Sequence, residues 1–305
     1  MITIIASKKA MEALQPLIEA YQKKGFIPRP VISDKLDVSS QLLAHYAEDS
    51  KAIVWVGAPR RSPRTLLTGP VLIRGDGTAI PIGYLPESNI ASIRLFAETA
   101  AKVQLRDGAQ QPVAILGQRH KKYIRLATRI ETLLNENNGK TPPYRWTSDL
   151  LVKEEMLKGL RSGLGLALYF GHGRPIGWVG YYGLRKHHFE ESKGEPLGAL
   201  LSICCATASR KRTGLSFSEA IPLQGAAAAS FGAVINTYHT DNTRWAVRIT
   251  NALQQGVKTI GELIVAASPP TQSAMDSYRI FGDPMAPICG AQQAIQLADK
   301  IKVYP

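Results

Sequence analysis

The chain has 305 residues, 45% of them hydrophobic and 20% charged, and this composition excludes an intrinsically disordered protein. Its formal net charge of +13 favours an acidic partner. Nucleic acid is possible through basic patches, although no nucleic-acid-binding motif accompanies them. No apolar run is long enough for a membrane helix, so we expect no membrane span.

The first hundred residues alternate between expected strands and helices, which is typical of a parallel sheet covered by helices. The expected strands are Ile2–Ala6, Val31–Ser33, Ala52–Val56 and Ile82–Leu85. The expected helices are Lys8–Lys24, Ser39–Tyr46 and Ile90–Lys102. Glycine, proline and arginine crowd the stretch Ala58–Pro81, which predicts an irregular loop there, with room for one hairpin.

A polar stretch, Asp107–Pro112, predicts the seam between a smaller α/β unit at residues 1–106 and a second unit at residues 107–305. In the second unit the expected strands are Val113–Leu116, Gly165–Phe170, Leu197–Cys204 and Ala233–Thr237. The expected helices are Tyr123–Leu134, Leu150–Leu160, Phe217–Pro222 continuing through Ala226–Ala229, and Thr243–Gln255.

Two of these strands end in residues that carry chemistry. One ends at His172, which lies between two glycines, and the next ends at Cys204 and Cys205. Either feature alone is as well explained by a glycine turn or a packed cysteine. Together, on adjacent parallel strands, they place an imidazole and a thiol over one edge of the sheet, as in an activated cysteine nucleophile. The amides of Gly173 and Cys205 would then stabilise the oxyanion.

At these residues the sequence resembles the caspase-like cysteine peptidases, above all the gingipain family and the related CHAT proteases. The resemblance rests on two blocks, Tyr169-Phe-Gly-His172-Gly173 and Ser202-Ile-Cys-Cys205-Ala-Thr207-Ala208. Further matching segments are Ile82–Pro86, Trp178, Phe217–Ala220, Gly232–Thr237, Trp245, Gly261–Glu262 and Ile280–Pro284. The similarity therefore extends over nearly the whole chain.

The resemblance implies a gingipain-type three-layer α/β sandwich. Its mainly parallel sheet has helices on both faces and follows a smaller α/β subdomain, with the caspase-like catalytic subdomain at residues 107–305. It also implies a cysteine endopeptidase that uses a His172–Cys205 dyad and needs no cofactor or metal. Cys205 fits the family register of the nucleophile, whereas Cys204 lies one residue early and on the opposite side of the strand. Ala208 stands where the family has a glycine.

The sequence departs from the family around the histidine. Secreted gingipains carry one acidic residue that orients the histidine and another that binds a basic substrate side chain. The corresponding stretch here, Leu116–Tyr123, contains no acidic residue. The basic residues of this segment would favour substrates with acidic side chains. Alternatively, Asp241 and the nearby Trp245 line the substrate site, and Asp241 restores a basic preference. The sequence does not rank these two alternatives.

Three cysteines without a C-x-x-C spacing, and no secretory signal pattern after Met1, predict a cytoplasmic protein without a zinc site. The expected partners are a protein or peptide substrate and a regulatory protein or ribonucleoprotein that restrains the enzyme. Two alternatives stay open at this point. One is a catalytically inactive scaffold with the same fold, and the other is a basic nucleic-acid-associated protein.

Overall fold

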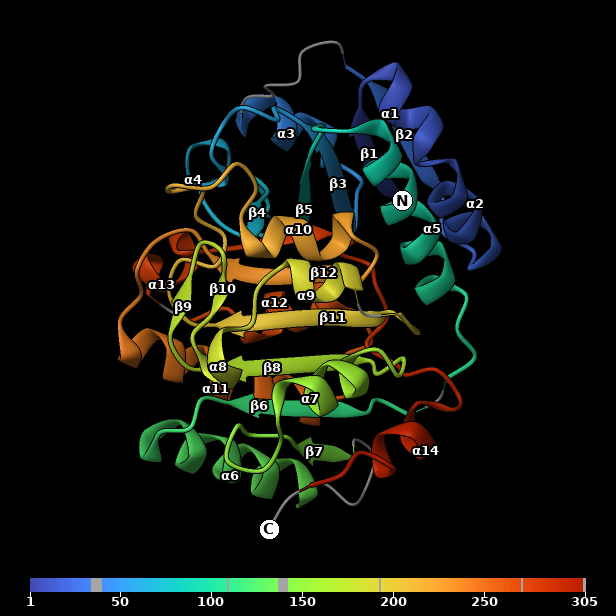
Figure 1. Ribbon diagram of the computed structural model, residues 1–305. Coiled ribbons are helices and arrows are strands. Elements are labelled where there is room, and N and C mark those ends of the chain that lie inside the picture. The colour runs from blue at the N-terminus through green and yellow to red at the C-terminus, as the bar shows by residue number, and fades with distance from the viewer. Residues whose placement is uncertain (34–39, 109, 137–141, 192, 270, 304–305) are drawn as a thin grey trace.

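The computed structural model describes residues 1–33, 40–108, 110–136, 142–191, 193–269 and 271–303. Its centre is an 11-stranded sheet with the order β2-β1-β3-β5-β13-β12-β11-β8-β6-β7, and β4 pairs with β5 off this path (Figure 1). The strands are β1 (Ile2–Ala6), β2 (Pro28–Ile32), β3 (Ala52–Gly57), β4 (Val71–Ile73), β5 (Ala79–Pro86), β6 (Val113–Gly117), β7 (Pro143–Arg145), β8 (Leu166–Phe170), β11 (Leu197–Ile203), β12 (Ala227–Ala233) and β13 (Tyr278–Gly282).

Most neighbouring strands of the sheet are parallel, and the antiparallel pairs among the described residues are β12–β13 and β4–β5. A separate hairpin joins β9 (Gly173–Arg174) to β10 (Gly177–Trp178). The helices are α1 (Lys8–Ala13), α2 (Gln15–Lys23), α3 (Ser40–Tyr46), α4 (Pro63–Leu66), α5 (Ile90–Gln104), α6 (Lys121–Asn135), α7 (Lys153–Leu160), α8 (Gly180–Gly183), α9 (His187–Glu191), α10 (Phe217–Leu223), α11 (His239–Gln254), α12 (Ile260–Ala267), α13 (Gln272–Asp276) and α14 (Ala294–Asp299).

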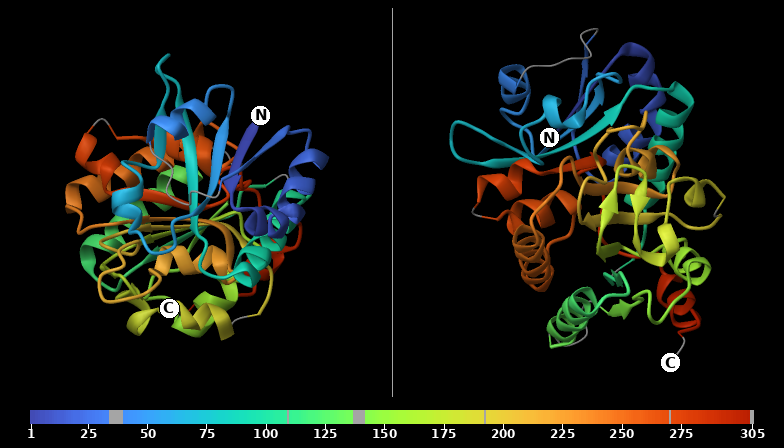
Figure 2. Two further views of the ribbon diagram at one scale, coloured as in Figure 1. Left: turned by 90° about the horizontal axis from the view of Figure 1, so that it is seen from above. Right: turned by 60° about the vertical axis from the view of Figure 1, so that its left-hand side comes forward.

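Helices cover both faces of the sheet (Figure 2), because successive side chains of each buried strand point to opposite sides. Leu168 and Leu201 lie in the apolar core shared with α6, α11 and α12. Tyr169 and Leu200 lie in a second core with α7, α10 and α14. This arrangement confirms the expected three-layer α/β sandwich with a mainly parallel sheet.

The two expected units share one sheet. β13, from the C-terminal part of the chain, pairs with β12 on one side and with β5 of the N-terminal part on the other. The seam at Asp107–Pro112 lies between α5 and β6. The boundary between residues 106 and 107 stays a prediction.

Two expectations about local structure are wrong. The segment Ala226–Ala229 is not helical, because Ala227–Ala233 forms the buried strand β12 and α10 ends at Leu223. Alanine favours helices in isolation, but here small side chains let α10 lie close to the sheet. A Cβ added to Gly232 would lie 2.1 Å from the Ser218 Oγ. Of the expected strand Ala233–Thr237, only Ala233 lies in a strand, as the last residue of β12.

The expected helix Lys8–Lys24 is two helices, α1 and α2, which meet at Leu14. Pro16 lies in the first turn of α2, where its missing N–H costs nothing. The expected start of another helix at Ser39 lies outside the described residues.

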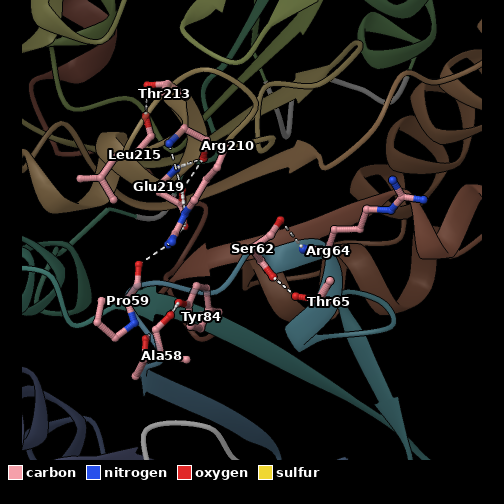
Figure 3. Close-up of polar contacts among 12 residues, drawn as sticks. Ala58, Pro59, Ser62, Arg64, Thr65, Tyr84, Arg210, Thr213, Leu215 and Glu219 are labelled. Carbon is pink, nitrogen blue, oxygen red and sulfur yellow. Dashed lines mark hydrogen bonds and ion pairs between the residues drawn. The ribbon is translucent and has the colours of Figure 1, made fainter.

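A buried ion pair ties the loop between β11 and α10 to the N-terminal part of the sheet (Figure 3). Arg210 Nε donates to both carboxylate oxygens of Glu219 at 3.0 Å, and Glu219 is fully buried. The same guanidinium donates through Nη1 to the carbonyl of Pro59, at 2.5 Å. Glu219 also accepts from the backbone N–H and hydroxyl of Ser216, in a capping box at the start of α10.

Replacing this carboxylate, as in Glu219→Gln, leaves the Arg210 guanidinium largely buried without a counter-charge. We expect the free energy of unfolding to fall by about 3 kcal/mol. Lys211→Met, at an exposed neighbouring cation, is the control and should change it by less than about 0.5 kcal/mol. Urea denaturation measures both, and an equal, small effect of the two substitutions would show that the ion pair does not secure this loop.

Candidate active site

The register of β8 and β11 brings the two predicted reactive residues to one edge of the sheet. These strands are parallel neighbours, and Phe170 of β8 pairs with Ile203 of β11. His172 and Cys205 each follow that pair by two residues. The predicted adjacency of the two strand ends is therefore confirmed, and the two segments leave the sheet side by side (Figure 1).

Gly173 is the point at which the two segments touch. A Cβ at this position would lie 2.3 Å from the Cys205 carbonyl oxygen and 2.6 Å from the Cys204 Sγ. Real Cβ atoms do not approach other atoms so closely, so only glycine allows this backbone contact. The residue after the histidine is thus packed directly against the residue expected to be the nucleophile.

The β9–β10 hairpin that carries Gly173 is fixed to the sheet by aromatic residues. Trp178 stacks on Tyr169 with 4.1 Å between ring centroids, and its Nε1–H donates to Ser202 Oγ at 2.8 Å. The Tyr169 hydroxyl donates to the backbone carbonyl of His172 at 3.2 Å and accepts from the Gly180 N–H at 3.1 Å. Residues of β8 and β11 therefore hold the hairpin, which limits the freedom of His172 and Gly173.

His172 is exposed at this edge, with its backbone held and its imidazole accessible. Its N–H donates to Gln118 Oε1 at 2.8 Å, and its ring lies 5.6 Å from the ring of Tyr123 in an edge-on contact. Partial burial, and then the positive charges of Lys122 and His120, lower the pKa of the imidazole. A lowered pKa keeps the ring neutral at neutral pH, which is the form that accepts a proton.

The structure separates the two adjacent cysteines. Cys204 is fully buried in the apolar core, and burial raises the pKa of its thiol well above the usual value. Cys205 is partly exposed, and its Sγ accepts from the N–H of Thr237 at 3.4 Å. Its thiol also lies 3.5 Å from Thr237 Oγ1. A thiolate is the nucleophilic form of cysteine, so burial disfavours Cys204, whereas the Cys205 thiol is accessible from the surface.

The turn after Cys205 has its left-handed residue at Ala206, with φ 55°. Alanine rarely adopts this conformation, and such strain gathers at functional sites. The Ala206 N–H donates to the Ile235 carbonyl at 2.9 Å, and the Ala208 N–H donates to that of Ala233 at 2.8 Å. Ala208, where the family has a glycine, does not have a positive φ, so its side chain does not strain the turn.

The two residues expected to bind substrate are not open to it. Trp245 is fully buried, and its Nε1–H donates to the Ala274 carbonyl at 3.1 Å. Its ring packs against Phe231 and Tyr278 in the core behind the site. Asp241 is 5% exposed and accepts from Arg244 Nη1 at 3.0 Å. This geometry leaves Trp245 with a core-packing role and gives Asp241 a counter-charge of its own.

Three supporting residues were missed in the sequence: Gln118, Tyr123 and Thr237. Thr237 contacts Cys205 from the loop after β12, and Tyr123 lies between His172 and His239, 6.4 Å from the latter ring. Gln118 and Thr237 both come just after strands of the parallel sheet, which was the available signal. Their hydrogen bonds depend on tertiary contacts that no local pattern encodes.

The described residues contain no group of three or more His, Cys, Asp or Glu side chains that is suited to hold a metal ion. Within those same ranges, no helix has both the length and the apolar character needed to cross a bilayer.

Comparison with solved structures shows the fold. The chain superposes on the Arg-specific cysteine proteinase gingipain R with TM-score 0.74 and 14% identity, covering 94% of this chain and 77% of that one. A complex of the pro- and mature domains of a Porphyromonas gingivalis gingipain gives TM-score 0.72 and 14% identity, covering 93% and 79%. A third structure, that of a protease, gives TM-score 0.73 and 15% identity, covering 95% of this chain and 78% of that one. None of these matches points to nucleic acid.

The family follows from the sequence itself. No curated protein gives a significant match. A family model described as peptidase family C25 matches residues 89–289, which include β8, β11 and the segments that follow them. Because this match spans well over half of the sequence, the chain belongs to peptidase family C25, the gingipain family of cysteine endopeptidases.

Proposed function

We propose that this cysteine endopeptidase works through a dyad of Cys205 and His172, with the amides of Gly173 and Cys205 as its oxyanion hole. One observation carries the proposal. The parallel register of β8 and β11 sets both residues two positions beyond a paired Phe170 and Ile203, with the backbone of Gly173 against the Cys205 carbonyl. A carboxylate partner is not required, because Gln118 and Tyr169 hold the histidine segment through its backbone.

The reaction proceeds in two halves. The proton of the Cys205 thiol moves to the His172 imidazole, and the sulfur attacks the carbonyl carbon of the substrate. The C–N bond then breaks, the imidazolium gives its proton to the leaving amine, and a thioester remains. Water next attacks the thioester while His172 takes its proton, which releases the acid and restores the thiol. In each half the two amides donate to the negatively charged oxygen.

We further propose that the substrate carries acidic side chains near the scissile bond. Lys122 and His120 lie close enough to His172 for their charges to lower the pKa of its imidazole. Two carboxylates on the segments that follow β11 and β12 are already paired, Glu219 with Arg210 and Asp241 with Arg244. This edge therefore offers positive charge to a substrate, and Asp241 gives little support to a basic preference.

The cytoplasmic location and the restraint of activity are also proposals. Cys204, Cys205 and Cys289 are all free thiols, which suits a reducing compartment. One solved gingipain structure is a complex of its pro- and mature domains, which supports restraint by a bound protein. For this chain we propose a separate regulatory protein bound at the edge formed by His172 and Cys205.

The nucleophile is tested by two single substitutions with a fluorogenic peptide library as substrate. Cys205→Ala should lower kcat/KM by at least about 1,000-fold, because the attacking atom is removed. Cys204→Ala should stay within about fivefold of the wild type, because that thiol is buried and does not face substrate. Loss of activity with Cys204→Ala alone would contradict the assignment. A wild type that cleaves nothing would favour the catalytically inactive scaffold.

The contact between the two segments is tested by adding one methyl group. Gly173→Ala forces its Cβ against the Cys205 carbonyl, so we expect kcat/KM to fall by about 100-fold through misplacement of the site. Gly214→Ala, in the loop that follows Cys205, is the matched control. Its Cβ would meet no atom within 4 Å, and activity should be unchanged. Full activity of Gly173→Ala would mean that this approach does not set the site.

The charge preference is tested with peptides that differ only in the side chains around the cleavage site. Acidic peptides should be cleaved with a higher kcat/KM than basic ones. Lys122→Glu should lower the acidic-to-basic ratio by about tenfold, which is about 1.4 kcal/mol. Lys9→Glu, an exposed lysine of α1, makes the same charge change elsewhere and should leave the ratio unaltered. A preference for basic peptides in the wild type would overturn this proposal.

A further inference from the structure

A second feature of the molecule lies at the opposite end of the strands from His172 and Cys205. It is a surface pocket of about 700 Å³ between α7, α14 and the segment around α9. Figure 1 shows α7 and α14 next to each other beside the amino-terminal end of β8. Arg161 and Lys193 line the pocket and precede β8 and β11, whereas the reactive residues follow those strands.

The pocket is strongly cationic. Its described lining includes Lys153, Lys158, Arg161, Lys193 and Lys300, and one carboxylate among the described residues, that of Glu154. These cations come from separate segments of the chain, so the folded protein gathers them at a cost in mutual repulsion. The nearby Glu195 does not offset this charge fully, because it is bonded to Lys102 at 2.7 Å.

Arg161 is held in place as part of the pocket wall. Its Nη1 donates to the Gly225 carbonyl at 2.9 Å and its Nη2 to the Gly194 carbonyl at 3.3 Å. Its buried Nε has no hydrogen-bond partner among the described residues. The guanidinium is thus fixed by neutral carbonyls, and Glu195, the carboxylate whose charge acts on it, is shared with Lys102.

The pocket also has an apolar wall. Leu157, Leu297 and Ile301 line it beside the cations, and Leu297 is 41% exposed. The volume is that of an ordinary small-molecule site. A single inorganic anion would reach only part of the cation set and none of the apolar wall. A ligand with several phosphate groups on a carbon skeleton matches both.

We propose that this pocket binds a soluble organic polyphosphate, whose phosphate groups contact the lysines and Arg161 while its skeleton packs on the leucines. The site is separate from the proposed dyad, so its occupancy does not depend on peptidase activity.

The test is isothermal titration calorimetry of the full chain with ATP, without divalent cations, at physiological salt. We expect saturable binding with a dissociation constant in the micromolar range. The double substitution Lys158→Gln/Lys300→Gln should weaken it at least tenfold. The matched control Lys8→Gln/Lys9→Gln removes two exposed charges from α1 and should change it less than twofold.

Several results would overturn the proposal. One is the absence of binding up to millimolar ATP, and another is equal weakening in both double variants, which would mean unspecific attraction to a basic protein. A third is equal affinity for sulfate at matched ionic strength. Binding to vesicles that contain a phosphorylated inositol lipid, without binding to ATP, would assign the pocket to a membrane headgroup and also contradict a soluble ligand.

Discussion

The close approach of Gly173 to the Cys205 carbonyl is the contact on which the proposed catalytic site depends. It exists because β8 and β11 are parallel neighbours whose last pair is Phe170 and Ile203, so the segments that leave the sheet begin side by side. Two further contacts at this edge support it. The stacking of Trp178 on Tyr169 holds one segment, and the hydrogen bonds of Thr237 hold the other. A sheet edge is a suitable place for such a site, because the loops carry the reactive groups while the strands keep them fixed.

The sequence predicted what depends on buried strands and on motifs. Apolar blocks that end in His172 and Cys205 specify strand ends, and the alternation of strands and helices specifies a covered parallel sheet. The sequence-based predictions failed where tertiary packing overrides the local preference for a helix or strand. Ala226–Ala229 looks helical because alanine favours helices, yet it forms part of β12, where small residues let α10 lie close. Trp245 matches a family position, but whether a tryptophan faces substrate or core depends on a helix orientation that one sequence does not reveal.

Burial and pairing decide which charged groups at the two ends of the sheet are available to a ligand. Glu219 is fully buried and neutralised by Arg210, and Asp241 is bonded to Arg244. The cations of the proposed catalytic edge and of the pocket near α7 and α14 are less fully balanced. The net charge of +13 therefore suggests two local tasks, attraction of an acidic substrate and binding of a polyphosphate, and not a general affinity for nucleic acid.

The central claim is that Cys205 is the activated thiol and that His172 activates it. Covalent labelling with a peptide-based thiol-reactive probe, followed by peptide mass mapping, tests this claim most directly. The account predicts one label, on Cys205, that forms much more slowly in His172→Ala, whereas Cys204 and Cys289 stay unmodified. Labelling of Cys204 or Cys289 in place of Cys205, or labelling of Cys205 at the same rate without His172, would contradict it.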